Sequence, residues 1–136
     1  MRGIRSRLVA ALRDDGGSAP VEFVLVGVLL TALTLGVLQF GLAVYVRNVV
    51  HDAAVEGAYH AALADTTALD GERRTREILT RTVGGGYATD VRASAVRTLG
   101  HDTVAVTVRA TLPLIGLWGA PGMLEVTAHA PLESFG

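Results

Sequence analysis

Residues 23–46 read FVLVGVLLTALTLGVLQFGLAVYV and contain no charged side chain. As a helix, this run would extend roughly 36 Å, enough to cross a hydrocarbon core of about 30 Å with some tilt. A buried core helix of that length would be unusual in a chain of 136 residues with a mean hydropathy of +0.42. The run therefore predicts a single-pass membrane protein.

The arginines on the two sides of this run predict its orientation. One arginine, Arg47, follows closely, and the next is Arg73. Four precede the run: Arg2, Arg5, Arg7 and Arg13. Because basic residues near a span favour the cytoplasmic side, we expect the N-terminus in the cytoplasm and the C-terminal domain outside it. The protein is thus expected to be anchored in the cell membrane by one span.

A possible cleavage site precedes the apolar run, in the sequence GGSAPVEF at residues 16–23. The run is longer than the apolar region of a secretory signal peptide, and no small-x-small site ends it. Cleavage after Gly17 would make Ser18 the first residue of the mature chain and Glu22 its fifth. Pro20 suits the first position of the helix, where its missing N–H has no partner to lose.

Glu22 permits two interpretations. It could be a first-turn acid that answers the positive end of the helix dipole, an effect of about 0.3–1 kcal/mol. It could instead be a functional carboxylate, kept in an apolar segment to pair with an amino terminus, its own or a neighbour's. Position alone leaves both open.

Beyond the membrane the pattern remains helical but becomes one-sided. One continuous helix is expected from Pro20 to Ala64. On its outer part, small and apolar residues oppose a polar face made of Arg47, Asn48, His51, Asp52, Glu56, Tyr59 and His60. A loop at 65–71 is then expected, followed by a second helix at 72–83 that Asp70 caps.

The second helix should point Ile78, Leu79 and Val83 inward and end at the glycines 84–86. From there the period changes to two. Runs at 91–97 and 104–110, joined by a turn at 99–102, predict a hairpin, and 124–130 predicts a third strand. The expected fold class is α+β: a long transmembrane helix, a short helix and a three-stranded antiparallel sheet with one apolar face.

The connection at 113–122, PLIGLWGAPG, is unusually apolar for a loop. It contains Trp118, the only tryptophan. It could fold back as a lid on the core, or it could be an exposed contact with a partner subunit or a membrane interface.

The sequence predicts no enzyme, no metal site and no cofactor or small-molecule substrate. It has no cysteine, and His51 and His60 would lie on opposite sides of a helix. A net charge of −1 with scattered arginines and few aromatic residues argues against nucleic-acid binding.

Residues 17–62 resemble the TadE-like family of tight-adherence (Flp-type) pilus assembly proteins. The order of the later strands is also similar. The motifs that carry the resemblance are Gly17, Glu22-Phe23, Phe40-Gly41, Tyr45, Arg47-Asn48 and the helical AAVEGA at 53–58.

The resemblance implies a pilin-like minor pseudopilin, or another assembly component of the pilus. A prepilin peptidase would cut between Gly17 and Ser18, and Glu22 and Phe23 would act in assembly. The parts would be a basic leader at 1–17, a transmembrane helix at 18–46 and a domain at 47–136. The partners would be membrane lipid, the peptidase, other pilins or pseudopilins and the pilus secretion machinery. The nearest alternative is an uncleaved single-pass accessory protein of a secretion or envelope complex, and a third is a membrane-anchored hydrolase.

Overall fold

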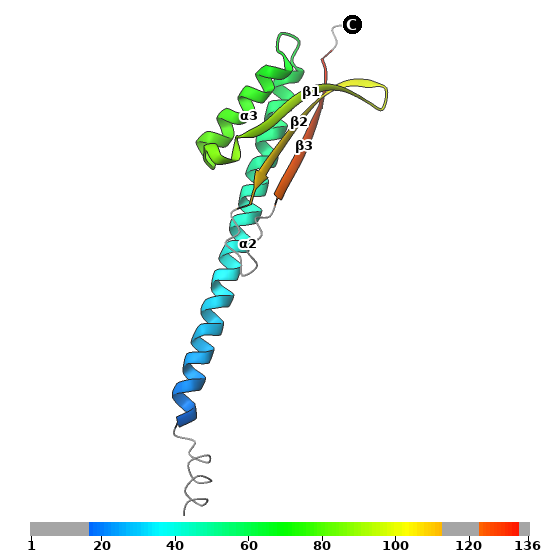
Figure 1. Ribbon diagram of the computed structural model, residues 1–136. Coiled ribbons are helices and arrows are strands. Elements are labelled where there is room, and N and C mark those ends of the chain that lie inside the picture. Colours follow the sequence, from blue (N-terminus) through cyan, green and yellow to red (C-terminus); the bar gives the residue numbers. More distant parts are fainter. Residues whose placement is uncertain (1–16, 113–122, 134–136) are drawn as a thin grey trace, which may run out of the picture. The chain divides into compact units, whose positions relative to one another are not determined.

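The computed structural model describes residues 17–112 and 123–133 (Figure 1). The helices are α2 (Ser18–Ala62), α3 (Ala68–Thr82) and a short 3-10 helix, η2 (Gly85–Tyr87). The strands are β1 (Asp90–Thr98), β2 (His101–Thr111) and β3 (Met123–Pro131). The predicted α+β class is confirmed. The chain divides into two compact units, the first ending at Leu38 and the second beginning at Gln39.

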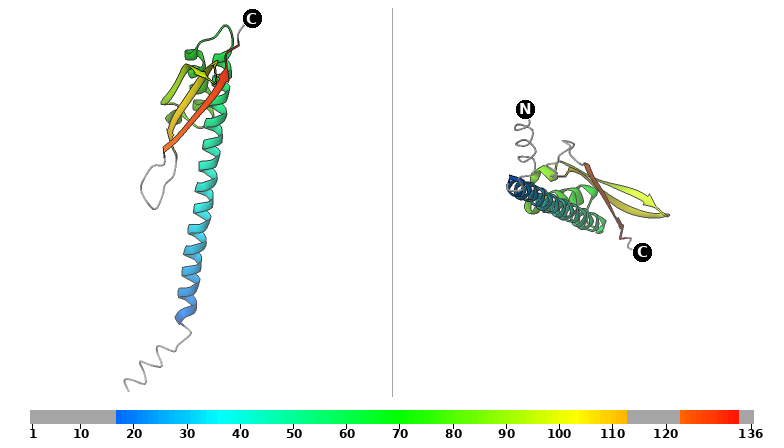
Figure 2. Two further views of the ribbon diagram at one scale, coloured as in Figure 1. Left: turned by 90° about the vertical axis from the view of Figure 1, so that its right-hand side faces the viewer. Right: turned by 90° about the horizontal axis from the view of Figure 1, so that it is seen from below.

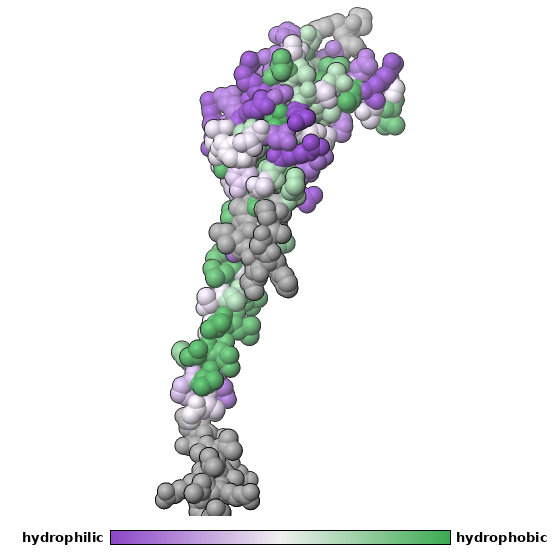
Figure 3. All heavy atoms as spheres, in the orientation of Figure 1, coloured by the Kyte–Doolittle hydropathy of each residue, from purple (hydrophilic) through white to green (hydrophobic). Residues whose placement is uncertain are grey.

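In the first unit, α2 has no described neighbour, and its apolar side chains are exposed. Figure 3 shows mostly hydrophobic side chains along the visible side of this part of the helix, and the large apolar residues from Val21 to Leu38 are exposed. Its most apolar 18-residue window has a mean hydropathy of 2.4, and none of that window is buried. Among the described residues, α2 is the one helix long and apolar enough to span a membrane. It is therefore a candidate membrane span.

The second unit contains the remainder of α2, which buries a single side. The predicted polar face lies outward, and the helix ends at Ala62, two residues before the predicted end. The buried positions are spaced three and four apart, as one helix face requires: Val46, Val50, Ala53, Ala54, Gly57, Ala58, Ala61 and Ala62. Most of these side chains are very small, so whatever packs on this face can approach closely.

The start of α3 differs from the prediction. The helix begins at Ala68, four residues earlier than expected, and Thr67 is its N-cap. Asp70 is the third helical residue and completes a capping box with Thr67. The T-x-x-D pattern of residues 67–70 was the signal for this start, since a short acidic side chain can reach back to the cap.

The inward residues and the end of α3 follow the prediction. Leu79 is fully buried, and Ile78 and Val83 pack against the core. Gly84 has a φ of +104°, which favours glycine, and its N–H donates to the carbonyl oxygen of Leu79, the acceptor that Val83 also uses.

The three strands form an antiparallel meander in the order β1-β2-β3. The turn between β1 and β2 is tighter than predicted. Thr98 pairs with His101, so only Leu99 and Gly100 form the turn, both with positive φ. The register places Val106 between Ala93 of β1 and Ala128 of β3, which gives the sheet its predicted apolar face.

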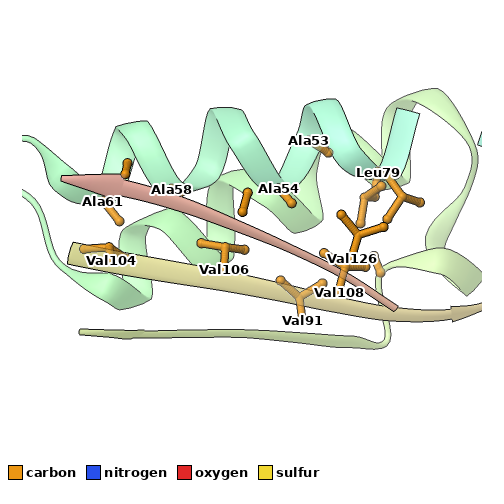
Figure 4. Packing of buried hydrophobic residues seen from close by; sticks show 14 of the residues in the cluster. Ala53, Ala54, Ala58, Ala61, Leu79, Val91, Val104, Val106, Val108 and Val126 are labelled. Carbon is orange, nitrogen blue, oxygen red and sulfur yellow. The ribbon is translucent and has the colours of Figure 1, made fainter. Parts of the chain in front are cut away.

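Both helices cover that apolar face. In Figures 1 and 2 the sheet lies along the C-terminal part of α2, where residues 46–62 bury one side, and α3 lies beside β1. Figure 4 shows Val106 and Val108 of β2 pointing toward α2 and toward Leu79 of α3. The opposite face of the sheet is polar, since it carries the hydroxyl pair Thr107–Thr127 and the ion pair Arg109–Glu125. The predicted apolar connection at 113–122 lies outside the described residues.

Candidate functional site

The four residues with predicted site roles lie at the amino end of α2. Gly17 is the first described residue, and Ser18 is the first residue of the helix. Pro20 is therefore the third helical residue and not the first. The position still suits proline, because the first four N–H groups of a helix have no helical acceptor.

Glu22 is the fifth residue of α2, so it lies beyond the first turn, which contains no acidic residue. The favourable effect of the helix dipole on an acid falls off within that turn. The dipole interpretation of Glu22 is weakened accordingly. Its carboxylate has no ion-pair partner within the described part of the chain, and its neighbours Val21 and Phe23 are exposed apolar side chains.

Ser18 and Glu22 are four residues apart in one helix, so their side chains lie on the same face. A chain that began at Ser18 would carry an ammonium group at that end of the face, because an α-amino group has a pKa near 7.7–8.0. A carboxylate in an apolar segment is costly unless a cation compensates it. This end of α2 is therefore suited to an ammonium–carboxylate pair, within one chain or between two.

A second feature is the crossing of α2 and α3, at the AAVEGA motif. A Cβ atom on Gly57 would overlap the hydroxyl of Thr75 and lie 2.7 Å from the carbonyl oxygen of Gly71. A Cβ atom on Gly71 would lie 2.5 Å from the Cβ of Ala61. Glycine is required at both positions because two backbones meet there without room for a side chain.

The side chain of Thr75 links the two helices at this crossing by hydrogen bonding. Its buried hydroxyl lies 2.9 Å from the carbonyl oxygen of Gly71 in its own helix and 3.3 Å from that of Ala53 in α2. Arg74 lies 3.4 Å from Glu56 across the same crossing, at the surface. Gly71 was expected in a loop, so this contact could not be predicted. The available signal was the small-residue series Ala53, Gly57, Ala61 at a spacing of four.

A polar groove lies between α2 and β3 in the second unit. Its volume is about 410 Å³. The residues that line it are Arg47, Asn48 and His51 of α2 and Glu125, Val126 and Thr127 of β3. Arg109 of β2 donates to Glu125 at 2.7 Å, and this carboxylate raises the pKa of Arg109 above its usual value. Glu125 is thus already paired, whereas Arg47 has no ion-pair partner among the described residues.

Other charged residues of the second unit form exposed ion pairs along α3 and the sheet. Arg81 pairs with Glu77, and Arg92 with Asp90. Within residues 17–112 and 123–133, no group of three or more His, Asp or Glu side chains could hold a metal ion.

The comparisons with known proteins concern the amino-terminal part of the chain. No curated protein and no solved structure matches the chain. One family model matches, described as TadE-like protein, over residues 17–58. The match begins at Gly17, includes Glu22, Phe23 and Arg47, and ends one residue after Gly57. The resemblance is thereby confirmed: the chain carries a TadE-like segment at residues 17–58, which comprises the candidate membrane span and the first part of the packed domain.

Proposed function

We propose that this protein is a minor pseudopilin, or another assembly component, of a tight-adherence type IV-like pilus. A prepilin peptidase removes the leader by cutting between Gly17 and Ser18. The single span holds the mature chain in the cytoplasmic membrane, with the N-terminus inside, until the helix joins the pilus or its assembly complex. The protein is a substrate and a structural component, and its partners are the peptidase, other pilins or pseudopilins and the secretion machinery.

The observation that carries this proposal is a carboxylate on the exposed part of α2 before Arg47, which is otherwise uncharged, four residues after the Gly17-Ser18 bond at the helix start. The TadE-like match begins at that glycine. In the mature chain, the new ammonium group of Ser18 and the carboxylate of Glu22 are complementary charges at the edge of the membrane. Their pairing with a neighbouring subunit would offset the cost of keeping a carboxylate there, and it would fix the axial position of one helix beside another.

The second unit supports a structural role. Its core is a closed two-layer packing of helices on a sheet, and the buried hydroxyl of Thr75 is satisfied. Among the described residues, the long exposed apolar surface lies on α2, which is the element that a lipid bilayer or neighbouring helices would cover.

The test is to express the full chain with and without its prepilin peptidase, and to measure the intact mass of the membrane-bound product. We expect a mature chain beginning at Ser18 only when the peptidase is present. Gly17→Val should block the cut, whereas Gly16→Ala should not, because the cut bond follows Gly17. Full-length protein in the presence of an active peptidase would reject the pseudopilin proposal in favour of an uncleaved accessory protein.

A further inference from the structure

The groove between α2 and β3 contains the one arginine of the described residues that has no carboxylate partner. The remaining described arginines are each within 4.0 Å of an Asp or Glu oxygen: Arg73, Arg74, Arg76, Arg81, Arg92, Arg97 and Arg109. Arg47 forms neither an ion pair nor a hydrogen bond with the described residues. An available guanidinium can form two parallel hydrogen bonds with a phosphate or a carboxylate.

Arg47 does not stand alone in this groove. His51 is four residues further along α2 and Asn48 is three residues before His51, so all three share one side of the helix. Residues 125–127 of β3 form the opposite wall. The one acid in the lining, Glu125, is compensated by Arg109 at 2.7 Å. The groove therefore has an excess of one positive charge and several hydrogen-bonding groups.

The position of the groove in the sequence indicates where its ligand would come from. Arg47 directly follows the 24-residue uncharged run that ends at Val46. Tyr45, two residues earlier, is exposed, and tyrosine is enriched at the level of the headgroups. If α2 spans a membrane, the groove opens where phospholipid headgroups are the most abundant anions.

We propose that the groove between β3 and the α2 side chains Arg47, Asn48 and His51 binds the phosphate of an anionic phospholipid headgroup in the outer leaflet. The inference goes beyond pilus assembly, and it requires α2 to span the membrane but not cleavage after Gly17. Bound lipid would fix the depth of the helix in the bilayer, because the guanidinium and the phosphate would have to lie at one level.

The test uses the full chain reconstituted in vesicles of equal parts phosphatidylglycerol and phosphatidylcholine. Native mass spectrometry of the solubilised protein counts the lipids of each kind that remain bound. We expect wild type to prefer phosphatidylglycerol, and Arg47→Gln to lower the preference about fivefold, since one arginine near an anionic surface contributes about 1 kcal/mol. Arg47→Lys should retain most of the preference.

The matched control is Arg92→Gln, which removes an exposed arginine that is paired to Asp90 on the outer face of the sheet. It should leave the preference unchanged. An unchanged preference in Arg47→Gln, or an equal loss in Arg92→Gln, would overturn the proposal. Excess inorganic phosphate should not displace the lipid from wild type; displacement would show a site for free phosphate and would also overturn it. None of these readouts involves the peptidase or the pilus, so the result is independent of the proposed function.

Discussion

The backbones of Gly57 in α2 and Gly71 in α3 meet where the two helices cross: a Cβ atom on Gly71 would lie 2.5 Å from the carbonyl oxygen of Gly57. This approach allows the hydroxyl of Thr75 to lie within 3.3 Å of the carbonyl oxygen of Ala53 on the other helix. The glycine of the AAVEGA motif is thus explained by packing within the domain.

Gly57→Ala should therefore destabilise the domain. Alanine favours a helix over glycine by about 1 kcal/mol, but the added methyl would press on Thr75 and on the backbone of Gly71. Overpacking of this kind costs about 1–3 kcal/mol, and the backbone cannot move aside as a flexible side chain could. Thermal unfolding of the detergent-solubilised chain, followed by circular dichroism, should show a lower midpoint. Gly41→Ala is the control, since within the described residues its methyl meets no atom within 4 Å beyond the neighbouring backbone of its own helix, and it should not lower the midpoint.

The N-terminus of α3 depends on its capping box. The backbone N–H of Thr67 donates to Oδ2 of Asp70 at 2.9 Å, and the Thr67 hydroxyl is 2.7 Å from the same oxygen. Thr67→Ala removes the cap and should lower the free energy of unfolding by about 0.5–2 kcal/mol. The same thermal measurement tests this, with Thr80→Ala, at an exposed position inside α3, as the control. Equal midpoints for the two variants would contradict a role for the cap.

The capping box should also make stability depend on pH. Hydrogen bonds from the side chain and backbone of Thr67, aided by Arg73, hold the pKa of Asp70 below its usual value. A carboxyl whose pKa is lower in the folded state stabilises the fold above its unfolded pKa, near 3.9. That contribution disappears as the pH falls from there through the folded value. The difference in the free energy of unfolding between wild type and Asp70→Asn should be largest at neutral pH and should decrease in that acid range. Asp102→Asn, at an exposed carboxyl, is the comparison.

The β1–β2 turn offers a stabilising substitution. Leu99 has a φ of +53° and is 95% exposed. It therefore adopts an unfavourable left-handed conformation, and its side chain gains no burial that would offset the cost. Leu99→Asn would produce the Asn-Gly pair that two-residue hairpins favour, and it should raise stability by about 0.5–1 kcal/mol. Leu99→Ala removes the same exposed side chain but keeps the unfavourable φ, so it should gain little. A lower unfolding midpoint for Leu99→Asn would mean that the leucine contributes something in this turn.

Glu22→Ala separates the two interpretations of this carboxylate. If Glu22 pairs with an amino terminus during assembly, the variant should still be processed, but it should fail to enter the pilus or its assembly complex. Intact mass reports the first step, and co-purification with the assembled complex reports the second. Thr34→Ala is the control in the same helix, because its hydroxyl donates to the carbonyl oxygen of Leu30 four residues earlier in that helix. Normal incorporation of Glu22→Ala would leave Glu22 without an assembly role.

The features that could be predicted are those with a signal in consecutive residues. The run at 23–46 is recognised by its length without a charge. The one-sided helix beyond it and the alternating strands repeat every 3.6 or 2 residues, which depends on the backbone alone. Leu79 and the apolar face around Val106 were found in this way. The motifs within residues 17–58 also lie in one continuous stretch of the sequence, and the TadE-like match confirms them.

The sequence alone thus determined the candidate span, the α+β order of elements and the residues at the start of α2. Tertiary structure decided what depends on two distant segments meeting. The small residues Ala53, Gly57 and Ala61 recur every four residues, but the sequence does not show that Gly71 packs against them. In the same way, nothing in the sequence around Arg47 shows that residues 125–127 form a groove with it. The fit of two backbones, or the absence of a partner for a charge, exists only once the helices and the sheet have packed.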